Sequence, residues 1–140
     1  MRFPTRARDF WQVASGEARH RATPETFWIP SLTQREGLRR GQAAKLLFEI
    51  EGQDEKGEQD VWTERMWVLV TERLQDGYLG ILTNQPAGIE PTDAFYLQER
   101  SEIPFRAEHV IDIDDPPPDF VAEVLTAGPR RSWPRDDAAA

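Results

Sequence analysis

The chain has 140 residues and a mass of 16.1 kDa, which is the usual size of one domain. It contains no cysteine, so disulfide scaffolds, thiol nucleophiles and Cys-ligated metal sites are excluded. No apolar run approaches the roughly 20 residues of a transmembrane helix, and no apolar stretch follows the charged N-terminus as in a secretory signal. We therefore expect a cytoplasmic protein that does not associate with membranes.

The net charge is −8 and the isoelectric point is near 4.8. This surplus of acid argues against nucleic acid as a partner, because phosphate binding is driven by basic residues. Fifteen of the 17 basic residues are arginine. Together with the frequent alanine and proline, this usage is typical of a GC-rich bacterial coding sequence.

Charge is unevenly placed along the chain. Residues 1–22 carry three net positive charges, residues 49–64 six net negative charges and residues 91–123 seven. The basic arm is expected to lie back on the acidic body or to be simply solvated. The alternative is that the two acidic segments form one face that recruits a basic partner, with Asp54, Glu55 and Glu58 as binding residues.

The first 42 residues predict short elements separated by breaks. Residues 6–20 form a candidate helix that Ser15-Gly16 interrupts, and residues 23–30 are extended between prolines. Ser31 is a candidate N-cap for a short helix ending by Arg39, with Gly41 as its left-handed stop.

The centre of the chain predicts a meander of three antiparallel strands. Residues 43–51 alternate apolar and polar, residues 52–59 form an acidic loop, and residues 61–74 form a second strand. That strand is apolar on both faces over 66–70, which is typical of a central strand covered on both sides. Asp76-Gly77 predicts a type I′ turn, with positive φ at Gly77, into a third strand at 78–83.

The remaining segments are shorter. We expect a helical turn within 91–99, strands at 102–105 and 110–113, a proline spacer at 116–118 and a helix around 120–125. The fold class is therefore α+β, an antiparallel meander forming a curved or barrel-like sheet with short peripheral helices. The expected organisation is an arm or short helix at 1–22, a single domain at 23–127 and a disordered tail at 128–140.

No catalytic motif marks the chain. It lacks the nucleophile elbow, the P-loop and the dinucleotide fingerprint, and its two histidines are not spaced as a metal pair. Asp112 and Asp114 share a strand face from which His109 is offset, which argues against a metal site there. We assign no catalytic residue, metal or cofactor. We expect His109 to cap a turn or lie half-buried, and Glu64 to face solvent or pair with an arginine.

The five tryptophans are candidates for either core or binding surface. Residue alternation places Trp62 and Trp67 on opposite faces of one strand. We expect Trp67 to lie in the core and Trp133 outside it. Trp62 is balanced between core and surface, and Trp28 is a candidate binding residue.

Two motifs resemble a known family. They are the runs Glu64-Arg65-Met66-Trp67-Val68-x-Val70-Thr71-Glu72 and Gly77-Tyr78-x-Gly80-x-Leu82-x-Asn84-x-Pro86. Shorter matches extend the likeness over residues 23–113: Phe27-Trp28-Ile29-Pro30, Leu38-x-x-Gly41, Lys45-Leu46-x-Phe48, Ile103-Pro104-Phe105 and Glu108-His109-Val110-Ile111. They resemble a bacterial family of domains of unknown function that is related to predicted immunity proteins of polymorphic toxin systems. The resemblance implies a small α+β fold and no settled activity.

These observations favour a non-catalytic protein-binding or regulatory module of the immunity type, with a basic protein as its partner. The candidate binding residues are Trp28, Asp54, Glu55, Glu58, Trp62, Arg65, Asn84 and His109. One alternative is a small enzyme that uses His109 with a carboxylate. Another is a single-stranded nucleic-acid binder that uses the Arg-rich arm. An exposed edge strand would also allow a homodimer.

Overall fold

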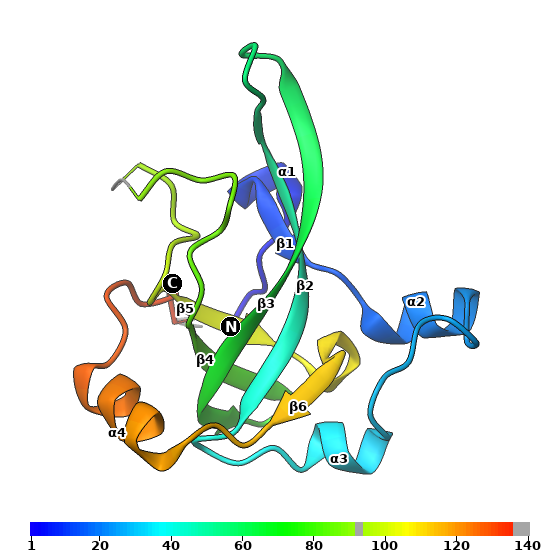
Figure 1. The fold of residues 1–140 in the computed structure, drawn as a ribbon, viewed down its shortest axis with the longest axis vertical. Coiled ribbons are helices and arrows are strands. Elements are labelled where there is room, and N and C mark those ends of the chain that lie inside the picture. The colour runs from blue at the N-terminus through cyan, green and yellow to red at the C-terminus, as the bar shows by residue number, and fades with distance from the viewer. Residues whose placement is uncertain (92–93, 136–140) are drawn as a thin grey trace.

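The computed structural model describes residues 1–91 and 94–135, and its core is an antiparallel six-stranded sheet that curls into a half-barrel (Figure 1). The strand order is β1 (Trp11–Val13), β2 (Ala43–Gln53), β3 (Gln59–Leu74), β4 (Gly77–Leu82) and β5 (Glu102–Phe105). A short strand, β6 (Asp112–Asp114), pairs with the start of β2. The α+β fold class and the antiparallel meander are confirmed.

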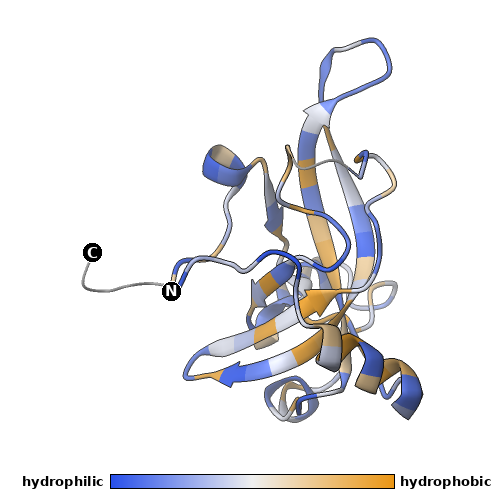
Figure 2. Cartoon of the chain, turned by 90° about the vertical axis from the view of Figure 1, so that its left-hand side faces the viewer, coloured by the Kyte–Doolittle hydropathy of each residue, from blue (hydrophilic) through white to orange (hydrophobic). Residues whose placement is uncertain are grey.

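Strands β2 and β3 form a long hairpin that extends beyond the rest of the sheet (Figure 1). They pair without interruption from Ala43 opposite Leu69 to Gln53 opposite Gln59. Strand β4 pairs only with the second half of β3, from Val68 onward. Figure 2 shows the consequence for hydropathy: hydrophobic residues gather low in the hairpin and hydrophilic ones occupy its tip.

Apolar side chains cover both faces of the lower sheet. The larger cluster fills the inside of the curl; it includes Trp11, Leu46, Phe48, Ile50, Val68, Val70, Tyr78, Leu97, Phe105 and Trp133. On the outer face, Leu69 and Ile81 pack against Val124 of α4 (Pro118–Ala127). The expectation that β3 is a central strand covered on both sides is confirmed at Val68, Leu69 and Val70, which are all fully buried.

The N-terminal region is part of the domain and contains no continuous helix over 6–20. It forms α1 (Arg6–Asp9), then β1, then α2 (Gly16–Ala22). Phe10 adopts a left-handed conformation, with φ of 66°, which ends α1. Trp11 then pairs with Ile50 of β2 and is completely buried. The helix prediction was wrong because a buried position in the sheet overrides the weak local helical pattern.

The N-cap prediction at Ser31 is confirmed. Ser31 and Gln34 form a reciprocal capping box that begins α3 (Leu32–Glu36). The helix ends earlier than predicted, with Gly37 as its C-cap, so Gly41 has a positive φ of 96° but is not the stop of this helix. By contrast, residues 94–99 form bends without a helical turn, and Thr92 and Asp93 lie outside the described residues.

The β3–β4 hairpin is present, but its turn differs from the prediction. Leu74 pairs with Gly77, so the turn residues are Gln75 and Asp76, and Gly77 does not have a positive φ. Gly77 is required for a different reason. A Cβ atom there would lie 2.6 Å from the carbonyl oxygen of Phe105 on the neighbouring strand β5.

The tail prediction was wrong for residues 128–135. Trp133 is 2% exposed, and its Nε1 donates a hydrogen bond to the carbonyl oxygen of Arg2 at 2.9 Å. Its main-chain N–H donates to the carboxylate of Glu102, which also pairs with Arg135. The segment stays in place because these contacts compensate for its low apolar content; residues 136–140 lie outside the described part of the chain.

Trp67 is half-buried on the outer face of the sheet rather than in the core. It lies directly opposite Lys45, whose Nζ is 5.5 Å from the centre of the Trp67 ring. The outer face is covered by α4 only around Leu69 and Ile81, so Trp67 remains at the margin of that cover.

Candidate functional site

A cleft of about 700 Å³ lies between the projecting half of the β2–β3 hairpin and the loop that follows β4. Its lining residues come from these two segments: Gln53, Asp54, Glu55, Lys56, Glu58, Asp60, Trp62, Glu64, Ala87 and Gly88. Five of them are carboxylates and one is a lysine. The cleft is therefore strongly acidic.

The tip of the hairpin is shaped by Asp54. Its Oδ1 accepts hydrogen bonds from the main-chain N–H groups of Lys56 and Glu58, at 2.8 and 2.9 Å. Gly57 supplies the left-handed conformation that closes this turn, with φ of 80°. The Asp54 side chain thus fixes the loop, and the side chains of Glu55 and Glu58 are left exposed to solvent.

Trp62 forms the aromatic wall of the cleft. Its ring lies against Gly52 and Gly88, where an added Cβ atom would approach ring carbons to 3.1 and 2.6 Å. Its Nε1 donates a hydrogen bond to Oε2 of Glu64 at 2.8 Å. Glycine at position 88 therefore lets the loop after β4 lie directly on the indole.

Glu64 ties the two sides of the cleft together. Its Oε1 accepts the main-chain N–H of Ala87 at 2.7 Å, and its Oε2 accepts that of Gly88 at 3.3 Å. The expectation that Glu64 faces solvent or pairs with an arginine was wrong, since its partners are an indole and two amides. Glu64 positions the loop after β4 and Asp54 the hairpin tip, while the exposed carboxylates of Glu55, Glu58 and Asp60 are available to a ligand.

The basic N-terminal region neutralises only the base of this acidic segment. Arg19 lies 3.9 Å from Glu49 and Arg6 lies 3.5 Å from Glu51, which confirms that the arm lies back on the acidic body. Within the described part of the chain, no arginine or lysine forms an ion pair with the carboxylates nearer the tip: Asp54, Glu55, Glu58 and Asp60. Lys56 is the one cation among the cleft residues, so the cleft keeps a net negative charge.

The two acidic segments do not form one face. Asp112 and Asp114 pair with Lys45 and Ala43 at the start of β2, whereas the acidic tip begins at Gln53. Eight residues of strand separate Lys45 from Gln53, which is about 26 Å. Four of the sequence-predicted binding residues, Asp54, Glu55, Glu58 and Trp62, nevertheless meet in the cleft.

Trp28 and Arg65 lie together elsewhere, in a hollow of about 240 Å³ on the outer face. Phe27 lies beneath the Arg65 guanidinium, 5.4 Å from the ring centre, and Trp28 is 67% exposed. Lys45 and Asp112 share this hollow, so its charges nearly balance. Asn84 lies apart from this hollow and accepts the main-chain N–H of Trp67 through Oδ1 at 2.8 Å, so its side chain caps the edge of β3 where β4 ends.

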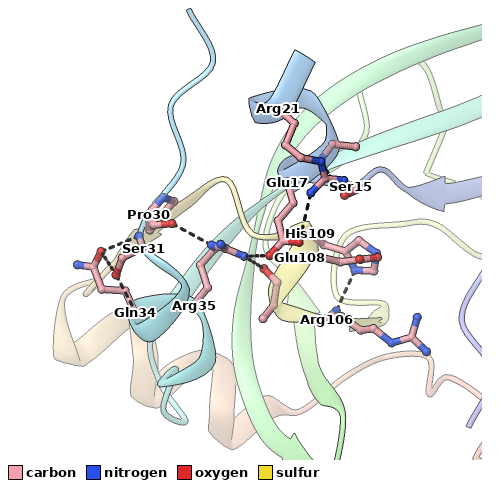
Figure 3. Close-up of polar contacts among 12 residues, drawn as sticks. Ser15, Glu17, Arg21, Pro30, Ser31, Gln34, Arg35, Arg106, Glu108 and His109 are labelled. Atoms are coloured by element: carbon pink, nitrogen blue, oxygen red, sulfur yellow. Dashed lines mark hydrogen bonds and ion pairs between the residues drawn. The ribbon is translucent and has the colours of Figure 1, made fainter. Parts of the chain in front are cut away.

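His109 is buried and structural (Figure 3). It ends the short 3₁₀ turn Ala107–His109, and its Nδ1 accepts the main-chain N–H of Arg106 at 2.8 Å. Burial, with a smaller effect of the Arg106 charge, lowers the pKa of His109 to about 4. The imidazole is therefore neutral at pH 7, and the expectation of a turn-capping histidine is met.

A buried ion pair beside His109 was not found from the sequence. Arg35 is 5% exposed and donates to Glu17 at 2.7 Å, to the carbonyl of Ala107 at 2.9 Å and to that of Pro30 at 2.9 Å (Figure 3). It joins α2, α3 and the 3₁₀ turn. The sequence reasoning also missed Ala87 and Gly88 as part of the cleft, since only the loop path brings them there; a Pro-Ala-Gly turn was their one local signal.

Across residues 1–91 and 94–135, no three His, Asp or Glu side chains are grouped closely enough to hold a metal ion. Within the same residues, none of the helices has the length and apolar character to cross a membrane. Comparisons with models of protein families, with curated proteins and with solved structures find no match.

Proposed function

We propose that this protein is a non-catalytic binding module that takes up a basic segment of a partner protein in the acidic cleft. The observation that supports this proposal most directly is the cleft itself. Asp54, Glu55, Glu58 and Asp60 surround the Trp62 ring there, and none of these carboxylates forms an ion pair with a cation among the described residues. Lysine or arginine side chains provide the complementary charge, and their aliphatic stems suit an aromatic wall.

The protein places these acids away from its own basic groups, and this supports a role in binding. Glu49 and Glu51 have arginine partners, while the tip carboxylates have none among the described residues. The resemblance to predicted immunity proteins fits the same class of function.

The alternatives have less support from the residues concerned. His109 lines neither the acidic cleft nor the hollow beside Trp28, and its Nδ1 is already engaged with Arg106. Arg2, Arg6 and Arg19 of the N-terminal region pair with Asp9, Glu51 and Glu49. Neither the hypothesis of an enzyme that uses His109 nor that of a nucleic-acid binder that uses the N-terminal arginines has a site comparable to the acidic cleft.

The test uses the synthetic peptide Lys-Val-Lys-Val-Lys-Val-Lys as a basic probe and Glu-Val-Glu-Val-Glu-Val-Glu as its acidic counterpart. Calorimetric titration is expected to detect binding of the basic peptide only. Binding should weaken between 50 and 300 mM salt because screening shortens the range of the charges. Reversal of Glu55, Glu58 and Asp60 to lysine, which leaves the Asp54 turn intact, should weaken binding at least tenfold, which is about 1.4 kcal/mol.

The matched control is reversal of Asp114, Asp119 and Glu123, three exposed acids distant from the tip, to lysine. It changes the net charge by the same amount and should change affinity less than twofold. Equal weakening by the two triple variants would show that only the overall charge matters, and the proposal would fail.

A further inference from the structure

The projecting half of β3 has one unpaired edge. Trp67 directs both its main-chain N–H and its C=O away from β2, since they bond to the Asn84 side chain and to the N–H of Thr83. Main-chain groups alternate along a strand, so Val61, Thr63 and Arg65 direct theirs the same way. Strand β4 leaves β3 before reaching them.

The residues along this edge are exposed, and the strand is regular. Val61 is 42% exposed, and the side chains of Thr63 and Arg65 are exposed as well. The register with β2 runs through this stretch without a bulge. Among the described residues, the one hydrogen bond to the outward main-chain groups of Val61, Thr63 and Arg65 is from the Val61 N–H to the side chain of its neighbour Asp60. Such an edge is a template for another strand.

The edge and the acidic cleft belong to the same stretch of β3, residues 60–65. Asp60, Trp62 and Glu64 alternate with Val61, Thr63 and Arg65, so their side chains point to the opposite face, where they line the cleft. A strand added beside Val61–Arg65 would present every second side chain to the carboxylates and the indole. Its other side chains would lie beside Val61, Thr63 and Arg65.

We propose that the basic segment binds by β-strand addition, as an extended antiparallel strand hydrogen-bonded to Val61, Thr63 and Arg65. This inference rests on the proposed function and specifies how the partner is held. Main-chain hydrogen bonds give the pairing, and the acidic cleft selects lysine or arginine at alternate positions. β-branched residues fit the positions between them, since they favour a strand and face Val61 and Thr63.

Charge decides between a basic partner and a second copy of this chain. Antiparallel pairing of two β3 edges about Thr63 would bring two acidic hairpins together, each with six net negative charges over residues 49–64. Like charges opposed across a pairing are unfavourable. A basic strand instead meets uncompensated carboxylates.

Backbone methylation of the probe tests the pairing directly. In the antiparallel arrangement the residues opposite Val61, Thr63 and Arg65 are the valines of Lys-Val-Lys-Val-Lys-Val-Lys, and their N–H groups point at β3. N-methylation of the valines should weaken binding at least tenfold. N-methylation of the inner lysines, whose N–H groups point to solvent, should change affinity less than twofold, although both peptides keep the charge of the parent.

Variants of Thr63 test the protein side. Thr63→Pro removes the outward N–H without touching the bonds to β2, and proline is tolerated where a strand faces solvent. It should weaken peptide binding as valine methylation does, while Thr63→Val, which keeps the N–H, should not. The exchange of the Thr63 and Arg65 amide hydrogens should slow when the parent peptide is bound.

Each outcome separates the two proposals. If both methylated peptides bind like the parent while reversal of Glu55, Glu58 and Asp60 weakens binding, the cleft binds basic segments and strand addition is wrong. Loss confined to lysine methylation would overturn the antiparallel orientation. If the parent peptide does not bind, or the two triple reversals act alike, the proposed function fails too. A dimer by sedimentation that Thr63→Pro dissociates would identify a second copy as the occupant and overturn the basic partner.

Discussion

Trp11 and Trp133, from opposite ends of the chain, meet edge to face in the core with ring centroids 5.7 Å apart and an interplanar angle of 78°. Tyr96 stacks on Trp11, with its ring 6.0 Å away. The two ends therefore close the inside of the curled sheet together. This aromatic contact also places the Arg2 guanidinium 4.5 Å from the centre of the Trp133 ring.

Truncation of Trp133 is expected to be among the more damaging changes. Trp133→Ala should lower the free energy of unfolding by about 3–5 kcal/mol, because it leaves a large cavity against Trp11. Trp28→Ala is the control, and with a side chain 67% exposed it should cost within about 0.5 kcal/mol. Urea unfolding measures both; equal costs would contradict the placement of Trp133.

Two glycine-to-asparagine substitutions distinguish a glycine that is needed for close packing from one that is needed for a left-handed turn. Gly77→Asn should destabilise by about 1–3 kcal/mol, because its Cβ would overlap the Phe105 carbonyl. Gly57→Asn should cost less than about 1 kcal/mol, since asparagine accepts positive φ and nothing lies within 4 Å of the added Cβ. Thermal melts compare them. If Gly77→Asn leaves the melting temperature unchanged, the close approach to the Phe105 carbonyl is contradicted and the predicted type I′ turn is supported instead.

His109 makes stability depend on pH. Burial lowers its pKa from 6.5 to about 4 in the folded state, so between these values the unfolded chain binds more protons. The contribution is fully present above pH 6.5 and is lost as pH falls toward 4. Its size is about 3 kcal/mol.

The control for this pH dependence is His109→Asn, whose side-chain oxygen can still accept the Arg106 N–H. Unfolding of both proteins in urea at pH 4.5 and pH 7.5 isolates the histidine from the carboxylates they share. The loss of stability at pH 4.5 should be smaller in the variant. Identical losses would show that His109 does not titrate in this range.

The local sequence pattern was sufficient to predict an element wherever that element is specified by its own residues. Alternation over 43–51 predicted β2, and Ser31 predicted the start of α3, because its side chain bonds within the same turn. The acidic loop at 52–59 and Trp62 were predicted as binding residues, and they share one cleft because the hairpin is continuous. Asp112 and Asp114 were grouped with that loop, but the register of β6 places them at the far end of β2.

The sequence alone determined the antiparallel meander, the charge of the hairpin tip and the capping of α3, since strand alternation, loop composition and caps depend on neighbours a few residues away. Only the tertiary structure decided that Trp133 is core, that Trp67 is not, and that Gly77 is needed for its small size. These outcomes depend on contacts with Arg2, Lys45 and Phe105, which are remote in the chain. The unpaired edge of β3 is of the same kind, because it exists only where β4 turns away.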